Sequence, residues 1–228
     1  MNTQHGATLA VVLLLVLAIA LIGAYSVRNS ISALQFSTHR QIQSLLFQSS
    51  DAALFQIEDS RMLTRQLAQD GIFHYFDSAL NMQDELVLCY RASQADFFLL
   101  AQASAISPNG DSSKRGERGF CKANDYATAR AAVYTQMYVT KNADRAAPLS
   151  HLIQGSSLGQ SALPMATQQI HVMVISVLPS FSAIANTQLE RCFKQKANQV
   201  VQCFTQFDVP FNVLHASYAV ESQAKLKP

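Results

Sequence analysis

The stretch HGATLAVVLLLVLAIALIGAYSV, from His5 to Val27, contains no Asp, Glu, Lys or Arg, and every such residue of the chain lies at Arg28 or beyond. The 21 residues from Ala7 to Val27 would span about 31 Å as an α-helix, close to the roughly 30 Å hydrocarbon thickness of a bilayer. Three interpretations are open: a cleaved secretory signal, a permanent membrane anchor, or the head of a filament subunit. A secretory signal predicts a basic start and a cleavage site between small residues. The AIA at 18–20 could serve as that site, but no Lys or Arg precedes the run.

The residues that follow predict more helix. No Gly or Pro occurs between Gly23 and Gly71, so 47 consecutive residues lack a helix breaker. Apolar side chains recur there at helical spacing. They are Val27, Ile31, Leu34, Ile42, Leu45, Ala53, Ile57, Leu63 and Leu67. The pattern indicates either a membrane span joined to a separate core or coiled-coil helix, or one helix of about 60 residues, roughly 90 Å long.

The sequence QHGATLAVVLLLVLAIALIGAYSV, with SSDAALFQIEDS at 49–60, resembles the N-terminus of PilX-type minor pilins of type IV pili. The similarity covers about the first 60 residues, and its most specific feature is a Gly followed directly by an apolar run without a basic flank. The resemblance implies that a prepilin peptidase cuts between Gly6 and Ala7 on the cytoplasmic side and methylates the new amine at Ala7. The apolar run is then kept in the mature protein.

Two features depart from the common pilin pattern. Prepilin leaders usually carry Lys or Arg, which residues 1–6 lack, and the positive-inside tendency would place Arg28 and Arg40 in the cytoplasm, opposite to pilin topology. Most pilins also have Glu at the fifth position of the mature chain, where this sequence has Val11. A carboxylate in the bilayer costs about 2.5–3.5 kcal/mol on insertion scales, and the resemblance implies that pilins keep it to pair with the amine of a neighbouring subunit. PilX-type subunits and the corresponding minor pseudopilin of type II secretion lack it too.

The resemblance also implies a domain organisation: a leader at 1–6, a transmembrane half-helix at 7–27, an amphipathic half-helix at 28–70 and a globular domain at 71–228. The implied partners are other minor pilins, the major pilin, a prepilin peptidase and a tip adhesin. The expected location is the inner membrane with the body in the periplasm, and then the pilus tip at the cell surface. Two other functions stay open: a minor pseudopilin of a type II secretion system, and a periplasmic binding protein with a cleaved signal.

Beyond Gly71 the pattern predicts an α+β body whose antiparallel sheet follows the long helix, which is also the pilin layout. The expected elements are a short buried helix at 95–106, strands at 131–140 and 168–178, a helix beginning at Thr187 with a Thr187–Glu190 capping box, and a last strand at 210–220.

Four cysteines, an even number, all lie beyond the apolar run: Cys89, Cys121, Cys192 and Cys203. No Cys-x-x-Cys or His-x-x-His occurs, so a zinc site is not predicted. If the body is exported, two disulfides are expected, and the sequence-local choice among three connectivities pairs Cys89 with Cys121 and Cys192 with Cys203. Eleven residues of helix rise about 16 Å, whereas a disulfide needs Cα atoms within about 7 Å. The helix that holds Cys192 must therefore end near Asn198.

Charge gives little indication of a polyanion-binding protein. The net charge is +2, from 17 Lys and Arg against 15 Asp and Glu. One basic concentration, Lys114, Arg115 and Arg118, lies in SPNGDSSKRGERG, where Gly, Ser and Pro predict an exposed loop. A solvated loop is the favoured interpretation and a nucleic-acid contact the weaker one, since three cations neutralise few phosphates.

The best catalytic match is GSSLG at 155–159, which fits G-x-S-x-G with Ser157 as the nucleophile. A nucleophile elbow needs a doubly wound sheet around it, and the chain that follows Pro164 is too short for one.

The other titratable residues do not form a recognisable site. His171 and His215 are interpreted as ordinary residues of their strands, and the adjacent Asp84 and Glu85 do not share one helical face. We therefore expect no enzyme activity, no cofactor and no metal site.

Overall fold

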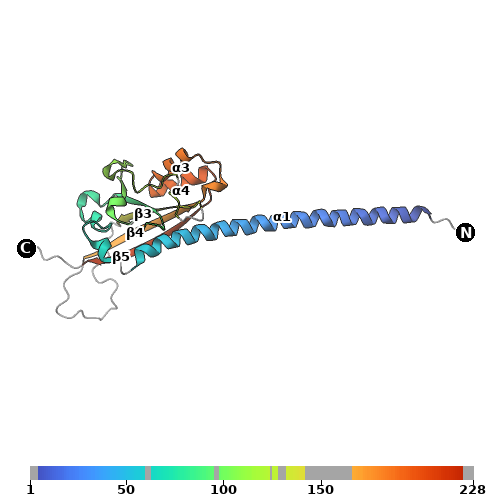
Figure 1. The fold of residues 1–228 in the computed structure, drawn as a ribbon, viewed down its shortest axis with the longest axis horizontal. Helices are drawn as coiled ribbons and strands as arrows, with labels where there is room; N and C mark the ends of the chain where they lie inside the picture. Colours follow the sequence, from blue (N-terminus) through green and yellow to red (C-terminus); the bar gives the residue numbers. More distant parts are fainter. Residues whose placement is uncertain are drawn as a thin grey trace, which may run out of the picture. The chain divides into compact units, whose positions relative to one another are not determined.

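The computed structural model describes residues 5–59, 63–94, 98–123, 125–127, 132–141 and 166–222. The chain divides into two compact units, Met1–Ser44 and Leu45–Pro228, which are described separately below. The helices are α1 (His5–Glu58), α2 (Leu63–Leu67), α3 (Asn186–Phe193) and α4 (Ala197–Gln206), and the strands are β1 (Glu85–Tyr90), β2 (Ser104–Ile106), β3 (Tyr134–Lys141), β4 (Ala166–Val177) and β5 (Phe211–Ser222) (Figure 1).

α1 is one uninterrupted helix of 54 residues. Of the two interpretations of the N-terminal region, the structure therefore has the single long helix. Gly23 lies in its interior, and a Cβ added to that residue would have nothing within 4 Å. No close packing inside this chain therefore requires glycine there.

α1 ends at Glu58, before the end expected at residue 70. The side chain of Gln66 caps this helix end: its Nε2 donates a hydrogen bond of 3.0 Å to the carbonyl oxygen of Ile57, which satisfies one of the carbonyl groups left free there. The short α2 follows, so the region expected as one amphipathic half-helix is the remainder of α1 plus a second helix. Gly71 follows α2 and lies against its backbone, because a Cβ there would lie 2.1 Å from the backbone oxygen of Gln66.

The body contains a five-stranded antiparallel sheet with the strand order β2-β1-β3-β4-β5. Together with α1, this sheet confirms the expected α+β class. β3, β4 and β5 confirm the strands expected at 131–140, 168–178 and 210–220, and β4 lies inside the sheet between β3 and β5. β1 was not among the expected elements, although all its residues after Glu85 are buried.

The helix expected at 95–106 is wrong. Within the described part of this range, a single 3₁₀ turn at Leu100–Gln102 is followed by β2, which pairs with β1 through Glu85 and Ile106. Apolar runs this short do not distinguish a buried helix from a buried strand, and here the free edge of β1 decides the conformation.

The capping box expected at Thr187 and Glu190 is not formed. α3 begins at Asn186, and Gln188 Oε1 accepts a hydrogen bond from the backbone N–H of Ala185 at 3.2 Å. Glu190 instead accepts from the backbone N–H of Ala123 at 2.8 Å. The chain turns after Phe193, earlier than the expected Asn198, and α4 begins at Ala197.

The second unit has three layers, which Figure 1 shows around β3, β4 and β5. The last turns of α1 cover one face of the sheet with Ala53, Leu54 and Ile57, which join the core formed by the side chains of that face. α3 and α4 cover the other face with Leu189, Cys192, Phe193, Val200, Cys203 and Phe204. Alternate residues of β4 enter the two cores, as the period of a strand requires.

Candidate functional site

The N-terminal half of α1 presents apolar side chains to its surroundings on all sides. The large apolar residues between Leu9 and Val27 are all exposed, and Val11 has 59% of its surface accessible. α1 is the one helix among the described residues that is long and apolar enough to cross a membrane. Exposing apolar surface to water costs roughly 25 cal/mol of free energy for each Å². A bilayer, or the apolar surfaces of other helices, would remove that cost.

The residues of the expected processing site lie in the first turns of this helix, since α1 begins at His5. Gly6 and Ala7 precede Val11, and positions 7 and 11 are one helical turn apart on the same face. A carboxylate at position 11 would therefore lie beside the N-terminus created by cleavage after Gly6. With valine at that position, this helix offers no negative charge to an amine.

Four buried hydroxyl groups join α1 to the sheet. Ser49 Oγ lies 2.7 Å from Thr135 Oγ1, Thr135 Oγ1 lies 2.7 Å from Ser176 Oγ, and Ser50 Oγ donates to Ser176 Oγ at 2.7 Å. Thr135 and Ser176 face each other across β3 and β4. Because a buried hydroxyl group needs a partner, this hydroxyl cluster (Ser49, Ser50, Thr135 and Ser176) fixes how α1 is rotated and positioned on the sheet.

The last residue of α1 is tied to β5. Tyr218 Oη donates a hydrogen bond of 2.7 Å to Glu58 Oε1. Burial raises the pKa of Tyr218, and the hydrogen bond to the Glu58 carboxylate raises it further. The hydroxyl cluster and this bond together attach α1 to both β4 and β5.

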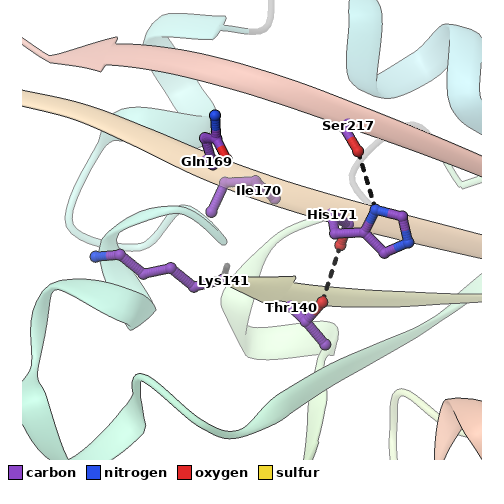
Figure 2. A pocket seen from close by; sticks show the side chains of 6 residues that line it. All are labelled: Thr140, Lys141, Gln169, Ile170, His171 and Ser217. Atoms are coloured by element: carbon purple, nitrogen blue, oxygen red, sulfur yellow. Dashed lines mark hydrogen bonds between the residues drawn. The ribbon is translucent and has the colours of Figure 1, made fainter. Parts of the chain in front are cut away.

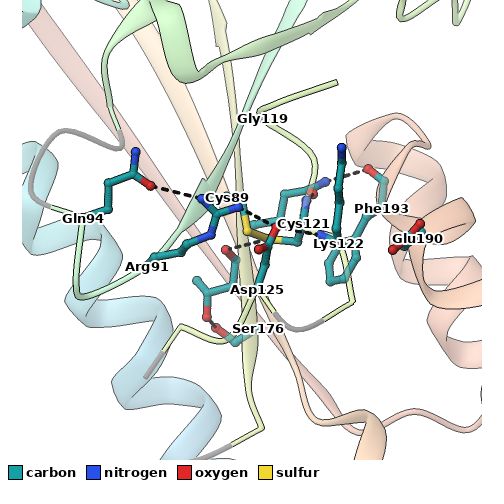
Figure 3. The surroundings of a disulfide bond; sticks show 12 residues. Cys89, Arg91, Gln94, Gly119, Cys121, Lys122, Asp125, Ser176, Glu190 and Phe193 are labelled. Carbon is teal, nitrogen blue, oxygen red and sulfur yellow. Dashed lines mark hydrogen bonds and ion pairs between the residues drawn. A yellow bond between two sulfur atoms is a disulfide. The ribbon is translucent and has the colours of Figure 1, made fainter. Parts of the chain in front are cut away.

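Both sequence-local cysteine pairs are bonded in the structure. Cys89 of β1 is joined to Cys121 with a Cα–Cα distance of 5.0 Å, and Figure 3 shows this disulfide beside the sheet. Near it, Arg91 forms an ion pair of 2.5 Å with Asp125, whose carboxylate also accepts from the backbone N–H of Lys122. The disulfide and this ion pair hold the segment after Cys121 against β1.

The second disulfide joins α3 to α4. Cys192 and Cys203 have Cα atoms 5.6 Å apart, which the turn between the two helices makes possible. Glu85 Oε2 accepts a hydrogen bond of 2.8 Å from the backbone N–H of Ala197. It thereby satisfies a free donor at the start of α4, where negative charge is favourable.

The basic loop is largely exposed, as expected, but two of its cations are bound to the body. Lys114 Nζ lies 2.6 Å from Oδ2 of Asp84, whose side chain is almost fully buried, and the same oxygen accepts from Tyr75 Oη at 2.6 Å. Arg115 donates to the carbonyl oxygen of Leu100 at 2.7 Å, and its guanidinium lies 5.6 Å from the centre of the Tyr75 ring. Burial, then the hydrogen bond to Asp84, raises the pKa of Tyr75. Two of the three cations thus have structural partners, which leaves less charge for a polyanion.

His171 and His215 lie closer together than the sequence suggested. Their rings are stacked with centroids 5.5 Å apart, and His171 Nδ1 lies 3.0 Å from Ser217 Oγ. Figure 2 shows His171 and Ser217 on one face of neighbouring strands. No group of three or more His, Cys, Asp or Glu side chains suited to a metal ion occurs among the described residues. GSSLG, with Ser157, lies outside the described residues.

The hydroxyl cluster, which positions α1 on the sheet, was not among the features predicted from the sequence. Its signal is the spacing of Leu46, Ser50, Ala53 and Ile57, which places a serine on the apolar face of an amphipathic helix. The partners on β3 and β4 leave no such signal, because they lie 86 and 126 residues away along the chain.

Comparisons of this chain with protein-family models, with curated proteins and with solved structures found no match.

Proposed function

We propose that this chain is a minor pilin of the PilX type, which takes part in assembling a type IV pilus. The observation that carries the proposal is the continuity of α1: its exposed apolar half runs without a break into a half that packs beneath an antiparallel sheet. A signal peptide that is cut away needs no such continuity. A subunit that keeps its helix, first in a bilayer and then among the helices of a filament, does need it.

The proposed role divides α1 by its surroundings. Residues 7–27 anchor the subunit in the inner membrane before assembly and pack among neighbouring helices afterwards. The part that contacts the sheet stays with the body, because Ala53, Leu54 and Ile57 are buried there and the hydroxyl cluster holds it. The body then reaches the periplasm, where its two disulfides are stable. We assign it no catalytic role.

The N-terminal residue of the membrane-extracted protein tests this proposal. Sequencing and intact mass are expected to give Ala7 with a methylated amine. An N-terminus at Leu21 would instead indicate a soluble exported protein, and one at Met1 a plain membrane anchor; either result would refute the pilin proposal.

A minor pseudopilin of type II secretion would have the same N-terminus. Deletion of the gene separates the two assignments, because loss of surface pili with normal protein secretion is expected for a pilin, and the reverse for a pseudopilin.

A further inference from the structure

Among the described strands, β5 forms one edge of the sheet, and that edge is open. Twelve residues, Phe211–Ser222, pair with β4 along one side, and within the described residues no strand pairs with the other side. On an antiparallel edge, every second residue directs its N–H and C=O away from the sheet. None of the residues 211–218 is fully buried, whereas residues 172–177 of the neighbouring β4 all are.

Among the described residues, the edge along β5 lacks three of the features by which proteins usually protect a sheet edge. Such features are short length, Lys or Pro in the strand, and bulges. β5 contains no Lys, Arg, Pro or Gly, its only charged residue is Glu221, and its register with β4 runs without a bulge. The opposite edge differs, since β2 has only three residues and all three are buried. The sequence of β5 therefore leaves a long edge available for pairing.

A groove of about 360 Å³ lies beside this edge, between α4 and the sheet. Its floor is apolar, with Tyr138, Met173, Ala197 and Val201, and His171 and His215 of the neighbouring strands also line it. A second hollow of about 330 Å³ adjoins it and shares Thr140 and His171 (Figure 2). His215 and Ser217 of β5 are both exposed on this face.

We propose that β5 and this groove together bind an extended peptide segment of another protein chain, which adds to the sheet as a sixth strand. In this mode of recognition, main-chain hydrogen bonds supply the affinity and pockets for alternate side chains supply the specificity. The open edge of β5 offers the main-chain hydrogen bonds, and the groove beside α4 offers a pocket for side chains. The inference does not rest on the pilin proposal, because both features belong to the body alone.

The geometry defines the chemistry of the bound segment. Its backbone would lie about 4.8 Å beyond β5, so a side chain must be long, such as Leu, Met or Phe, to pass over His215 into the groove. On the face covered by α1, smaller apolar residues would contact the half-buried Leu214, Ala216 and Tyr218, which already pack against that core. The segment needs no charge, because Glu221 is the only charged residue along the strand.

A synthetic peptide with the sequence of β4, ATQQIHVMVISV, is the probe. It already has side chains that match β5, because β4 pairs with all twelve residues of that strand, and its methionine falls on the groove side. The peptide carries a fluorescent label and two added lysines for solubility. Its anisotropy is measured with the full-length protein in detergent micelles and with empty micelles. Saturable binding is expected with protein only.

Two backbone-methylated forms of the peptide make the test specific. One is N-methylated at alternate even-numbered positions and the other at odd-numbered positions, so that only one form presents its remaining N–H groups to β5. One form is expected to bind like the parent peptide and the other at least about tenfold more weakly. Equal binding of both forms, or no saturable binding of the parent peptide, would overturn the proposal.

Val201→Arg tests the groove, and Gln202→Arg on the exposed side of the same helix is its matched control. The first variant is expected to weaken binding of the parent peptide at least about tenfold, and the second is expected to leave it unchanged. Disulfide mapping of Cys192 and Cys203 in both variants checks that α3 and α4 remain folded. Equal affinity of the two folded variants would show that the groove takes no part and would refute the combined site.

Discussion

Ser176 occupies the centre of the hydroxyl cluster. Its Oγ accepts from Ser50 and lies within hydrogen-bond distance of Thr135, and all three residues are buried. A buried hydroxyl group that loses its partner is unfavourable by about 1–3 kcal/mol, more than the net gain from a typical hydrogen bond. The cluster is therefore better at excluding wrong positions of α1 than at adding stability.

Ser176→Ala is expected to lower the free energy of unfolding by about 1–3 kcal/mol, because it leaves the Ser50 hydroxyl buried with one partner fewer. Urea unfolding of the full chain in detergent, followed by tyrosine fluorescence, measures the change. Ser182→Ala is the control, since the hydroxyl of that serine donates to the nearby carbonyl of Pro179 in a partly exposed turn. A loss no larger than in the control would contradict the assigned role of the cluster.

Gly6 is the residue at which a single substitution tests the proposed proteolytic processing. A bulky side chain before the scissile bond, as in Gly6→Leu, is expected to leave the protein at precursor mass, because the proposed peptidase requires glycine there. Gly23→Leu is the matched control: nothing lies within 4 Å of that position, so normal processing is expected. Intact mass of the membrane-extracted protein measures both. Normal processing of Gly6→Leu would rule out cleavage between Gly6 and Ala7.

At the scale of the elements, the two disulfides restrain loops of different size. Cys89–Cys121 spans 32 residues and Cys192–Cys203 spans 11. Chain entropy predicts a stabilisation of about 4 kcal/mol for the longer loop and about 3 kcal/mol for the shorter one. All four cysteines belong to the core on the face of the sheet away from α1; Cys89–Cys121 ties a peripheral segment to β1, and Cys192–Cys203 ties α3 to α4.

Replacing both cysteines of a pair with Ala is expected to lower the free energy of unfolding more for Cys89–Cys121 than for Cys192–Cys203. Denaturation of the two double variants, beside the parent protein, measures the order. Peptide mapping of the unreduced parent should show these two pairs and no free thiol. Cross-pairing between the two sets would refute the connectivity, and the reverse order of stability would refute the loop-size explanation.

The bond between Tyr218 and Glu58 makes the attachment of α1 to β5 sensitive to alkaline pH. Burial and the adjacent carboxylate raise the pKa of Tyr218, so the unfolded chain releases this proton first, near pH 10. The stabilisation is complete below about pH 10 and is lost as the pH rises above it. Burial raises the pKa values of Tyr75 and Tyr138 in the same direction, so a steep loss of stability is expected in that range.

Tyr218→Phe is expected to lower the free energy of unfolding by about 1 kcal/mol at neutral pH, through the lost hydrogen bond, and to make the decline above about pH 10 shallower. The exposed Tyr126 provides the control variant, Tyr126→Phe. Unfolding measured from pH 7 to pH 11 gives both the free energy of unfolding at neutral pH and its slope above about pH 10. An unchanged slope in Tyr218→Phe would contradict the assigned linkage.

The elements differ in how far the sequence could predict them. α1 was predictable because residues 24–70 lack Gly and Pro and their apolar side chains recur at helical spacing, and β4 because its run is apolar on both faces. The conformation of residues 98–106 was not predictable, because pairing with the free edge of β1 determines it. β1 is itself distant in sequence from most of its partners. The capping of α4 likewise depends on Glu85, which lies 112 residues before Ala197. Local patterns predicted the elements, and long-range contacts decided their ends.

At the scale of the whole molecule, the chain combines an apolar half-helix with a body that has its own two cores. Under the proposed function, the half-helix enters the filament core and the body remains outside. The open edge of β5 belongs to the body.

Val11 determines where such a subunit fits in a filament. A subunit with Glu at this position neutralises the amine of its neighbour, whereas Val11 leaves that amine unpaired in a low-dielectric core, where an unpaired charge is strongly unfavourable. The tip is the one place with no subunit above, so nothing there requires a carboxylate from this chain. We therefore predict low copy number, tip location and a role in starting assembly.

Deleting the gene is expected to reduce the number of surface pili more than their length, because initiation fails while elongation proceeds normally. Immunogold labelling of the body should mark pilus ends in the parent strain. Val11→Glu supplies the missing carboxylate at the position one helical turn from Ala7, so this variant should also appear within the shaft, and Val12→Glu, on a different face of the helix, should not. Gold distributed evenly along parent pili, or pili of normal number but reduced length after deletion, would place the subunit in the shaft and refute the argument from Val11.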